Sequence, residues 1–136
     1  MSKFTCFVFC ALADSDESGS NEELFALRDE CMKKFGVTQE EIDDIIKSDD
    51  VSKINSCYWG CYFMKMGLLN DKGQYDLNNF QTTIRKIMKD DEDFAVLEKQ
   101  GKTCAYVKDK AVSDGEAGCE RGALLAACFV KQELMR

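Results

Sequence analysis

The cysteines constrain this chain more than any other residue type. Eight occur in 136 residues that include no histidine. Cys57 and Cys61 lie one helical turn apart in the segment CYWGCYFMKMG, so both sulfurs would project from one face of a helix. A bond between them would distort that helix and restrain little of the unfolded chain. Each is therefore expected to pair with a cysteine on a different element.

Metal binding and thiol redox chemistry are poorly supported uses of these cysteines. The sequence has neither the C-x2-C knuckles nor the histidines typical of zinc sites, and it has no thioredoxin-like C-x-x-C motif. We therefore expect no metal site and no cofactor. A disulfide framework is the interpretation that remains.

The N-terminal residues MSKFTCFVFCALA have the layout of a short secretory signal. One positive charge at Lys3 precedes an apolar run over residues 4–12, and Ala13 is a small residue suited to cleavage. The run is shorter than the roughly 20 apolar residues that span a bilayer. The sequence predicts a signal peptide over 1–13 and one domain over 14–136. That domain keeps six cysteines, an even number, as expected of an exported disulfide protein.

Composition and charge exclude several classes of function. The formal net charge of −7 disfavours binding to nucleic acid or to anionic membrane surfaces, both of which need clustered Lys and Arg. Without histidine, the chain cannot form a Ser-His-Asp or Cys-His catalytic site, so we expect no enzyme. The complete lack of proline favours an all-α fold, as does the small number of strand-like alternations.

Capping patterns divide the chain into helices. Ser20 with Glu23 and Thr38 with Glu41 each form the pattern of a capping box, and Asp76 is a candidate N-cap. Apolar residues recur at helical spacing after each of these positions. Six helices are expected, over residues 20–36, 38–46, 52–66, 76–88, 91–107 and 118–135.

Geometry alone leaves the disulfide connectivity open. Cys119 and Cys128 fall in one expected helix, about 13 Å apart along its axis, which is too far for a bond. Six cysteines allow 15 pairings. Excluding the Cys57–Cys61 and Cys119–Cys128 bonds leaves ten of them, among which this reasoning does not choose.

The spacing of the six cysteines, C-x25-C-x3-C-x42-C-x14-C-x8-C, resembles that of the six-cysteine insect odorant-binding proteins, the pheromone and general odorant-binding family. The x3 and x8 intervals are the specific part of that signature, and the resemblance covers essentially the whole chain after the predicted signal peptide. The segment GLLNDKGQYD also resembles the loop that precedes the family's fourth helix.

The resemblance implies a six-helix bundle, held by disulfides, that encloses an internal apolar cavity. The function it implies is that of a secreted, non-catalytic carrier of small apolar molecules such as odorants, pheromones or lipid-like compounds, acting in sensillum lymph or another extracellular fluid. An odorant receptor and a second copy of the chain are candidate protein partners, while nucleic acid and membrane insertion are not expected. The implied bridges are Cys31–Cys61, Cys57–Cys119 and Cys104–Cys128.

A second apolar stripe on the helix that carries Cys57 predicts where a ligand would bind. Trp59, Phe63 and Met66 lie roughly 200° around that helix from the cysteine stripe. We expect them to line the cavity with apolar residues of other helices, and the candidate polar anchors for a ligand oxygen are Tyr58, Tyr62, Tyr106 and Thr83. The full set, called the wall residues below, is Leu24, Trp59, Phe63, Met66, Leu77, Phe80, Ile84, Met88, Leu97, Leu125 and Phe129.

Two alternative functions stay open at this point. The same fold could carry lipids or hormones in haemolymph, saliva, venom or reproductive fluid, outside the sense of smell. A membrane-active, saposin-like helical protein is a third hypothesis, but its cysteines follow another spacing and the acidic charge disfavours it.

Overall fold

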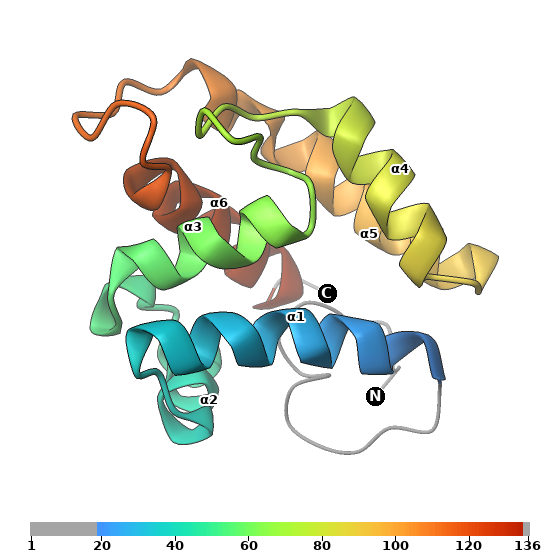
Figure 1. Ribbon diagram of the computed structural model, residues 1–136, viewed down its shortest axis with the longest axis horizontal. Coiled ribbons are helices and arrows are strands. Elements are labelled where there is room, and N and C mark those ends of the chain that lie inside the picture. Colours follow the sequence, from blue (N-terminus) through green and yellow to red (C-terminus); the bar gives the residue numbers. More distant parts are fainter. Residues whose placement is uncertain (1–18, 135–136) are drawn as a thin grey trace.

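The computed structural model describes the backbone of residues 19–134 and the side chains of residues 26–132. The predicted signal peptide, residues 1–13, lies outside the described residues. Within the described range the chain is all-α, as predicted, and no helix there is long and apolar enough to cross a membrane. The six helices are α1 (Gly19–Phe35), α2 (Gln39–Ser48), α3 (Ser56–Lys65), α4 (Leu77–Ile87), α5 (Asp91–Thr103) and α6 (Cys119–Leu134) (Figure 1).

Local side-chain capping sets several helix starts where the sequence predicted them. The Thr38 hydroxyl accepts a hydrogen bond from the Glu41 amide at 3.2 Å, and the Glu41 carboxylate accepts one from the Thr38 amide at 2.8 Å. This is the predicted capping box at the start of α2. Asp76 caps α4 by accepting from the Asn79 amide at 3.0 Å. Each cap satisfies an amide that the helix itself leaves without a partner.

Two helix boundaries differ most from the expectation, while the others lie within two residues of it. The third helix does not begin near residue 52, because Asp50 caps a short 3-10 turn, η3 (Val51–Lys53), and α3 starts only after Asn55 accepts a hydrogen bond from the Cys57 amide. The fifth helix ends at Thr103, and residues that were expected to extend it form the 3-10 segment η4 (Cys104–Asp109). Short 3-10 segments of this kind commonly replace the last turn of a helix.

Arg121, near the start of α6, binds backbone carbonyls at the end of η4 and directly after it. Its Nη1 donates to the carbonyl oxygens of Val107 at 2.6 Å, Lys108 at 3.2 Å and Lys110 at 3.1 Å. Its Nε donates to the Gly73 carbonyl at 3.2 Å, in the loop between α3 and α4. One guanidinium therefore joins three segments that are distant in sequence, which is a use of its fixed fork of donors.

Helix α3 lies at the centre of the described fold. In Figure 1 it runs across the middle of the molecule, with α1 below it and α6 behind it, and it packs against both. The contact with α6 is backbone to backbone, since a Cβ atom built at Gly122 would lie 2.4 Å from the Gly60 nitrogen, and one built at Gly60 would lie 2.7 Å from the Gly118 carbonyl oxygen. Only glycine permits so close an approach of two helices.

Three disulfides link the described helices. α3 is joined to α1 and to α6, and η4 is joined to α6, so that no described cysteine is free. These are the pairs that the resemblance implied, and they belong to the ten that geometry left open. The bonds are Cys31–Cys61, Cys57–Cys119 and Cys104–Cys128, with sequence separations of 30, 62 and 24 residues.

Candidate functional site

The wall residues come from five helices and the segments next to them, and the structure brings the described ones together. Leu24 is part of α1, but its side chain lies outside the described side chains. Leu77 is partly buried and packs against the core. The remaining nine are buried members of a single apolar cluster, which are Trp59, Phe63, Met66, Phe80, Ile84, Met88, Leu97, Leu125 and Phe129.

Aromatic contacts connect α3 to α6 through this cluster. The rings of Tyr58 and Trp59 meet edge to face with centroids 5.0 Å apart, and those of Phe63 and Phe129 lie 5.3 Å apart. The Trp59 indole nitrogen donates to the Val51 carbonyl at 3.3 Å, which orients the ring toward the interior. Edge-to-face and tilted pairs of this kind add to the stabilisation from burial.

The four candidate polar anchors have different environments. Tyr58 and Tyr62 are each only 1% exposed, and their rings stack with centroids 6.1 Å apart. Tyr106 is 54% exposed, and Thr83 is partly buried. Of the four, only the two tyrosines of α3 therefore present a polar group deep in the apolar interior.

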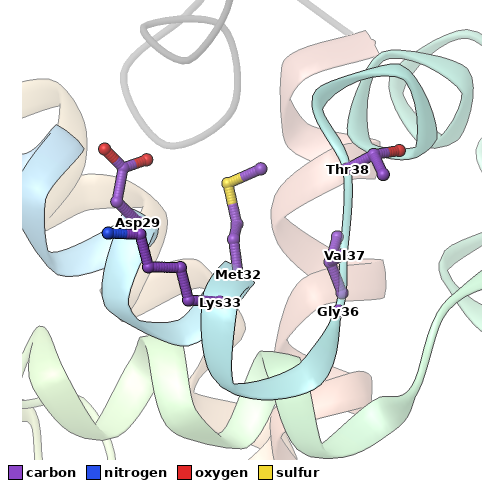
Figure 2. A pocket seen from close by; sticks show the side chains of 6 residues that line it. All are labelled: Asp29, Met32, Lys33, Gly36, Val37 and Thr38. Atoms are coloured by element: carbon purple, nitrogen blue, oxygen red, sulfur yellow. The ribbon is translucent and has the colours of Figure 1, made fainter.

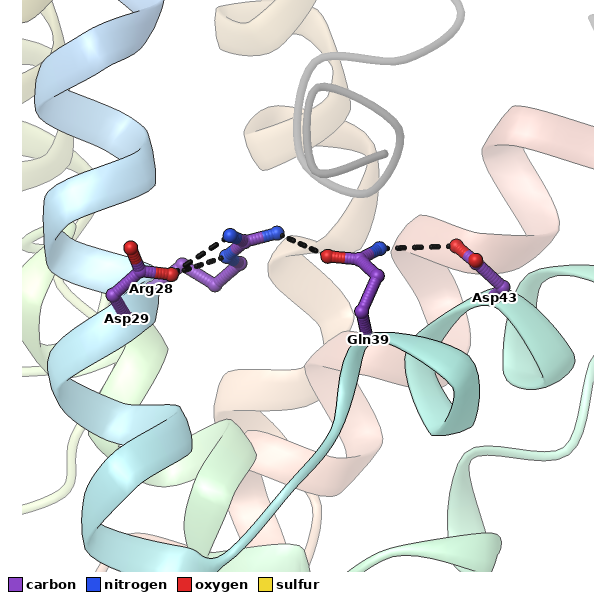
Figure 3. A network of polar contacts seen from close by, with 4 residues as sticks. All are labelled: Arg28, Asp29, Gln39 and Asp43. Carbon is purple, nitrogen blue, oxygen red and sulfur yellow. Dashed lines mark hydrogen bonds and ion pairs between the residues drawn. The ribbon is translucent and has the colours of Figure 1, made fainter. Parts of the chain in front are cut away.

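A polar network that the sequence reasoning missed lies between α1 and α2 (Figure 3). Arg28 is only 8% exposed; its Nε and Nη2 donate to Asp29 Oδ1 at 3.1 and 2.7 Å, and its Nη1 donates to Gln39 Oε1 at 2.8 Å. Gln39 Nε2 in turn donates to Asp43 Oδ1 at 3.1 Å. The position of Arg28, three residues before Cys31, could have revealed this network, because Arg28 shares a helix face with a buried cysteine.

Burial keeps the phenols of Tyr58 and Tyr62 in their neutral form. Burial is the largest cause that raises the pKa of each, and for Tyr58 the neighbouring Tyr62 raises it further. The positive charge of Arg28 lies within electrostatic reach of the two phenols and lowers the pKa of each, against the larger effect of burial. Both groups therefore remain hydrogen-bond donors far above neutral pH.

We expect these buried phenols to destabilise the fold in alkali. Below the ordinary tyrosine pKa of 10.0, the folded and unfolded states both keep the phenolic protons. Above it, only the unfolded state releases them easily, so the free energy of unfolding should fall by up to about 1.4 kcal/mol per pH unit for each phenol. Urea unfolding between about pH 9 and 11.5 measures this loss. A stability that stays level to pH 11 would contradict it, and the Tyr58→Phe variant should show a shallower decline.

Three hollows lined by described residues lie at the surface, away from the wall residues. The one in Figure 2 has a volume of about 420 Å³ and lies beside the turn from α1 to α2, where Met32 and Val37 supply apolar surface and Asp29, Lys33 and Thr38 supply polar groups. The second lies near Arg85 and Phe94, and the third near Cys61 and Met64. None of the three includes a wall residue, so the internal cavity and the ligand-binding role of the wall residues stay predictions.

The described side chains do not assemble a metal centre. Within that part of the chain, no three His, Cys, Asp or Glu residues gather closely enough to hold a metal ion. The six described cysteines are all engaged in disulfides, so none supplies the thiolate that a zinc ligand or nucleophile requires.

Comparison with known proteins relates this arrangement to a family. The model of the PBP/GOBP family matches residues 13–132. The chain is 24% identical over 102 residues to odorant-binding protein 10 from Aedes aegypti, an alignment that covers 71% of this chain and 73% of that protein. The fold is similar to that of odorant-binding protein dmelOBP28a from Drosophila melanogaster, with a TM-score of 0.52 and 19% identity over 88% of this chain and 97% of the other.

Proposed function

Because the chain belongs to the PBP/GOBP family, we propose that it is a secreted carrier that binds small apolar molecules in its interior and transports them through aqueous fluid. The observation that carries the proposal is the meeting of the ten described wall residues in one apolar cluster, in a fold whose α1, α3 and α6 are joined by disulfides. Both named relatives are odorant-binding proteins, so semi-volatile odorants are the first ligand class to test.

The chemistry of the wall residues fits binding rather than catalysis. Their side chains are hydrocarbon, aromatic or thioether groups, which bind through burial of surface and supply neither an acid nor a base. At about 25 cal/mol per Å², a ligand that buries roughly 300 Å² of apolar surface gains about 7 kcal/mol before the costs of association. Micromolar affinities and broad selectivity follow from such an interior, in which methionines adapt to several ligand shapes.

The disulfides support an extracellular location. Bonds of this kind form and persist in oxidising compartments and are rare in the cytosol. Together with the signal-like pattern of residues 1–13, they support removal of that segment and a mature domain over 14–136.

Displacement of a fluorescent apolar probe tests the proposal. We expect at least one alcohol, ester, aldehyde or fatty acid to displace the probe with an apparent dissociation constant below about 100 µM, which corresponds to roughly −5.5 kcal/mol. If no compound of such a panel competes at that concentration, the carrier function is wrong.

A matched pair of substitutions tests whether the wall residues form the ligand-binding site. Ile84 is a wall residue and Ile45 is not, yet both are fully buried, so Ile84→Val and Ile45→Val remove the same methylene equivalent at similar cost in stability. Only Ile84→Val is expected to weaken ligand binding, by about fourfold, since a buried methylene is worth about 0.8 kcal/mol. Equal losses of affinity in the two variants would argue against the wall residues.

A further inference from the structure

Helix α2 has fewer ties to the rest of the described fold than α3, although both helices contain ten residues. α3 carries Cys57 and Cys61, and disulfides join it to α1 and to α6. The α2 sequence QEEIDDIIKS has no cysteine, and its main contact with another described element is with the short η3. In Figure 1, α2 lies at the edge of the molecule, below α1. It can therefore move without the breaking of a covalent link.

The backbone on both sides of α2 is suited to a hinge. Gly36, just after α1, has a φ of 66°, and a Cβ atom built on it would meet no atom within 4 Å. Asp49 ends α2 with a φ of 58°, and its amide donates to the Ile45 carbonyl at 2.8 Å. Hinges are usually a few residues at the ends of elements that absorb a change in φ and ψ. α2 can therefore rotate as one unit between these two positions.

A polar network and two apolar side chains keep α2 closed. Arg28 Nη1 of α1 donates to Oε1 of Gln39, the first residue of α2, at 2.8 Å, and Gln39 Nε2 donates to Asp43 Oδ1 at 3.1 Å (Figure 3). Ile42 and Ile45 of the same helix are fully buried in the apolar cluster that contains the wall residues. The closed position is thus favoured, and its hydrogen bond to a charged donor must break when α2 moves away from α1.

This network lies between a surface hollow and the interior. Asp29, which pairs with Arg28, lines the hollow of about 420 Å³, and Met32 supplies apolar surface there (Figure 2). On the inner side, the Arg28 charge lies within electrostatic reach of the Tyr58 phenol in α3. The Tyr58 ring packs edge to face on the wall residue Trp59. A gap between α1 and α2 would therefore lead from the hollow toward the wall residues.

We propose that α2 is a lid that opens about Gly36 and Asp49, that the Arg28–Gln39 hydrogen bond is its latch, and that a guest molecule reaches the wall residues through the gap between α1 and α2. The lid is a property of the free protein, whereas the entry route rests on the proposed carrier function. The latch stabilises the closed position of the free and the loaded protein alike. Its removal should therefore speed binding and release by the same factor and leave the affinity unchanged.

Hydrogen exchange of the free protein, measured by nuclear magnetic resonance, tests the lid without any ligand. In the wild type, the amides of α2 should exchange faster than those of α3 and α6, because α2 opens without global unfolding. Gln39→Ala should speed the exchange of α2 about tenfold, as expected for loss of a hydrogen bond to a charged group, and leave α3 unchanged.

Gln81→Ala is the matched control for this variant. Gln81 is also partly buried, and it joins two helices, α4 and α5, through a hydrogen bond of 2.8 Å to Glu98. Its replacement removes the same side chain from another helix pair, so the exchange of α2 should stay at the wild-type rate. Equal acceleration of α2 in the two variants would overturn the latch.

Stopped-flow binding of phenylnaphthylamine, a fluorescent apolar probe, tests the entry route. In Gln39→Ala, the association and dissociation rate constants should each rise about tenfold, with a dissociation constant within about twofold of the wild type. In Gln81→Ala, neither rate constant should change. Equal rate constants in the wild type and Gln39→Ala would overturn the entry route.

The two measurements distinguish failure of the lid from failure of the carrier function. If the amides of α2 exchange at the same rate as those of α3, or if Gln39→Ala speeds exchange in all helices alike, the lid is wrong even though the probe binds. If α2 opens as expected but neither the probe nor any apolar compound binds the wild type, the carrier function is wrong, and the entry route with it.

Discussion

Substitution of Gly122 by alanine should lower the free energy of unfolding by about 3 kcal/mol, the upper part of the range for overpacked cores. The added Cβ would lie 2.4 Å from the Gly60 nitrogen, 2.6 Å from the Gly60 Cα and 2.7 Å from the Trp59 carbonyl carbon. These are backbone atoms of α3, which cannot rotate away as a side chain could. α3 and α6 would have to separate along the contact that lies at the centre of the fold.

Urea unfolding with the disulfides intact measures this effect. The sign of the change in the free energy of unfolding distinguishes a backbone clash from an effect of helix propensity. Helix propensity alone would make the alanine variant more stable by up to about 1 kcal/mol. Ala127→Ser, at an exposed position of the same helix, is the control and should change stability by less than about 0.5 kcal/mol. A Gly122→Ala protein as stable as the wild type would show that the two backbones are not in direct contact.

Replacement of both Cys57 and Cys119 by alanine is expected to cost about 4 kcal/mol, the value of the chain-entropy model for a sequence separation of 62 residues. Among the three described disulfides this one closes the longest loop. Both cysteines are partly exposed, so their truncation leaves little buried void and the loss reflects mainly the greater freedom of the unfolded chain.

The native fold of this double variant should persist, because Arg121 and the Gly60–Gly122 contact still hold the start of α6. Far-ultraviolet circular dichroism should therefore show unchanged helix content, while urea unfolding shows a lower midpoint. A loss below about 1 kcal/mol would contradict the entropic account, and a loss of helix content would show that the disulfide also maintains the native packing.

The covalent links bear on the proposed function as well as on stability. An interior that opens to admit a ligand gives up packing contacts, at about 24 cal/mol per Å³ in series of core truncations. Disulfides offset that cost without filling the interior, since they act mainly on the unfolded chain. A small domain can thus stay folded and still keep room for a guest molecule.

Much of the fold was predictable because its signals are local. The capping box of Thr38 and Glu41 and the N-cap at Asp76 each depend on residues at most three positions apart, and both appear where the sequence predicted them. The all-α class followed from helical spacing of apolar residues, and the six-cysteine spacing pointed to the family and its pairing. The apolar stripe of Trp59, Phe63 and Met66 also identified part of the buried cluster.

Other features depended on which surfaces meet in three dimensions. Helical periodicity says that a face is buried, but not what covers it, so it could not place Arg28 against Gln39 or Tyr58 in the interior. Gly122 appeared in the sequence as one small residue in a helix, and only the crossing with α3 made its missing side chain essential. The sequence by itself determined the helices and the cysteines available to link them, because those signals act between near neighbours along the chain. The tertiary structure decided which polar groups lie in the interior and where two backbones touch, because both depend on contacts between distant segments.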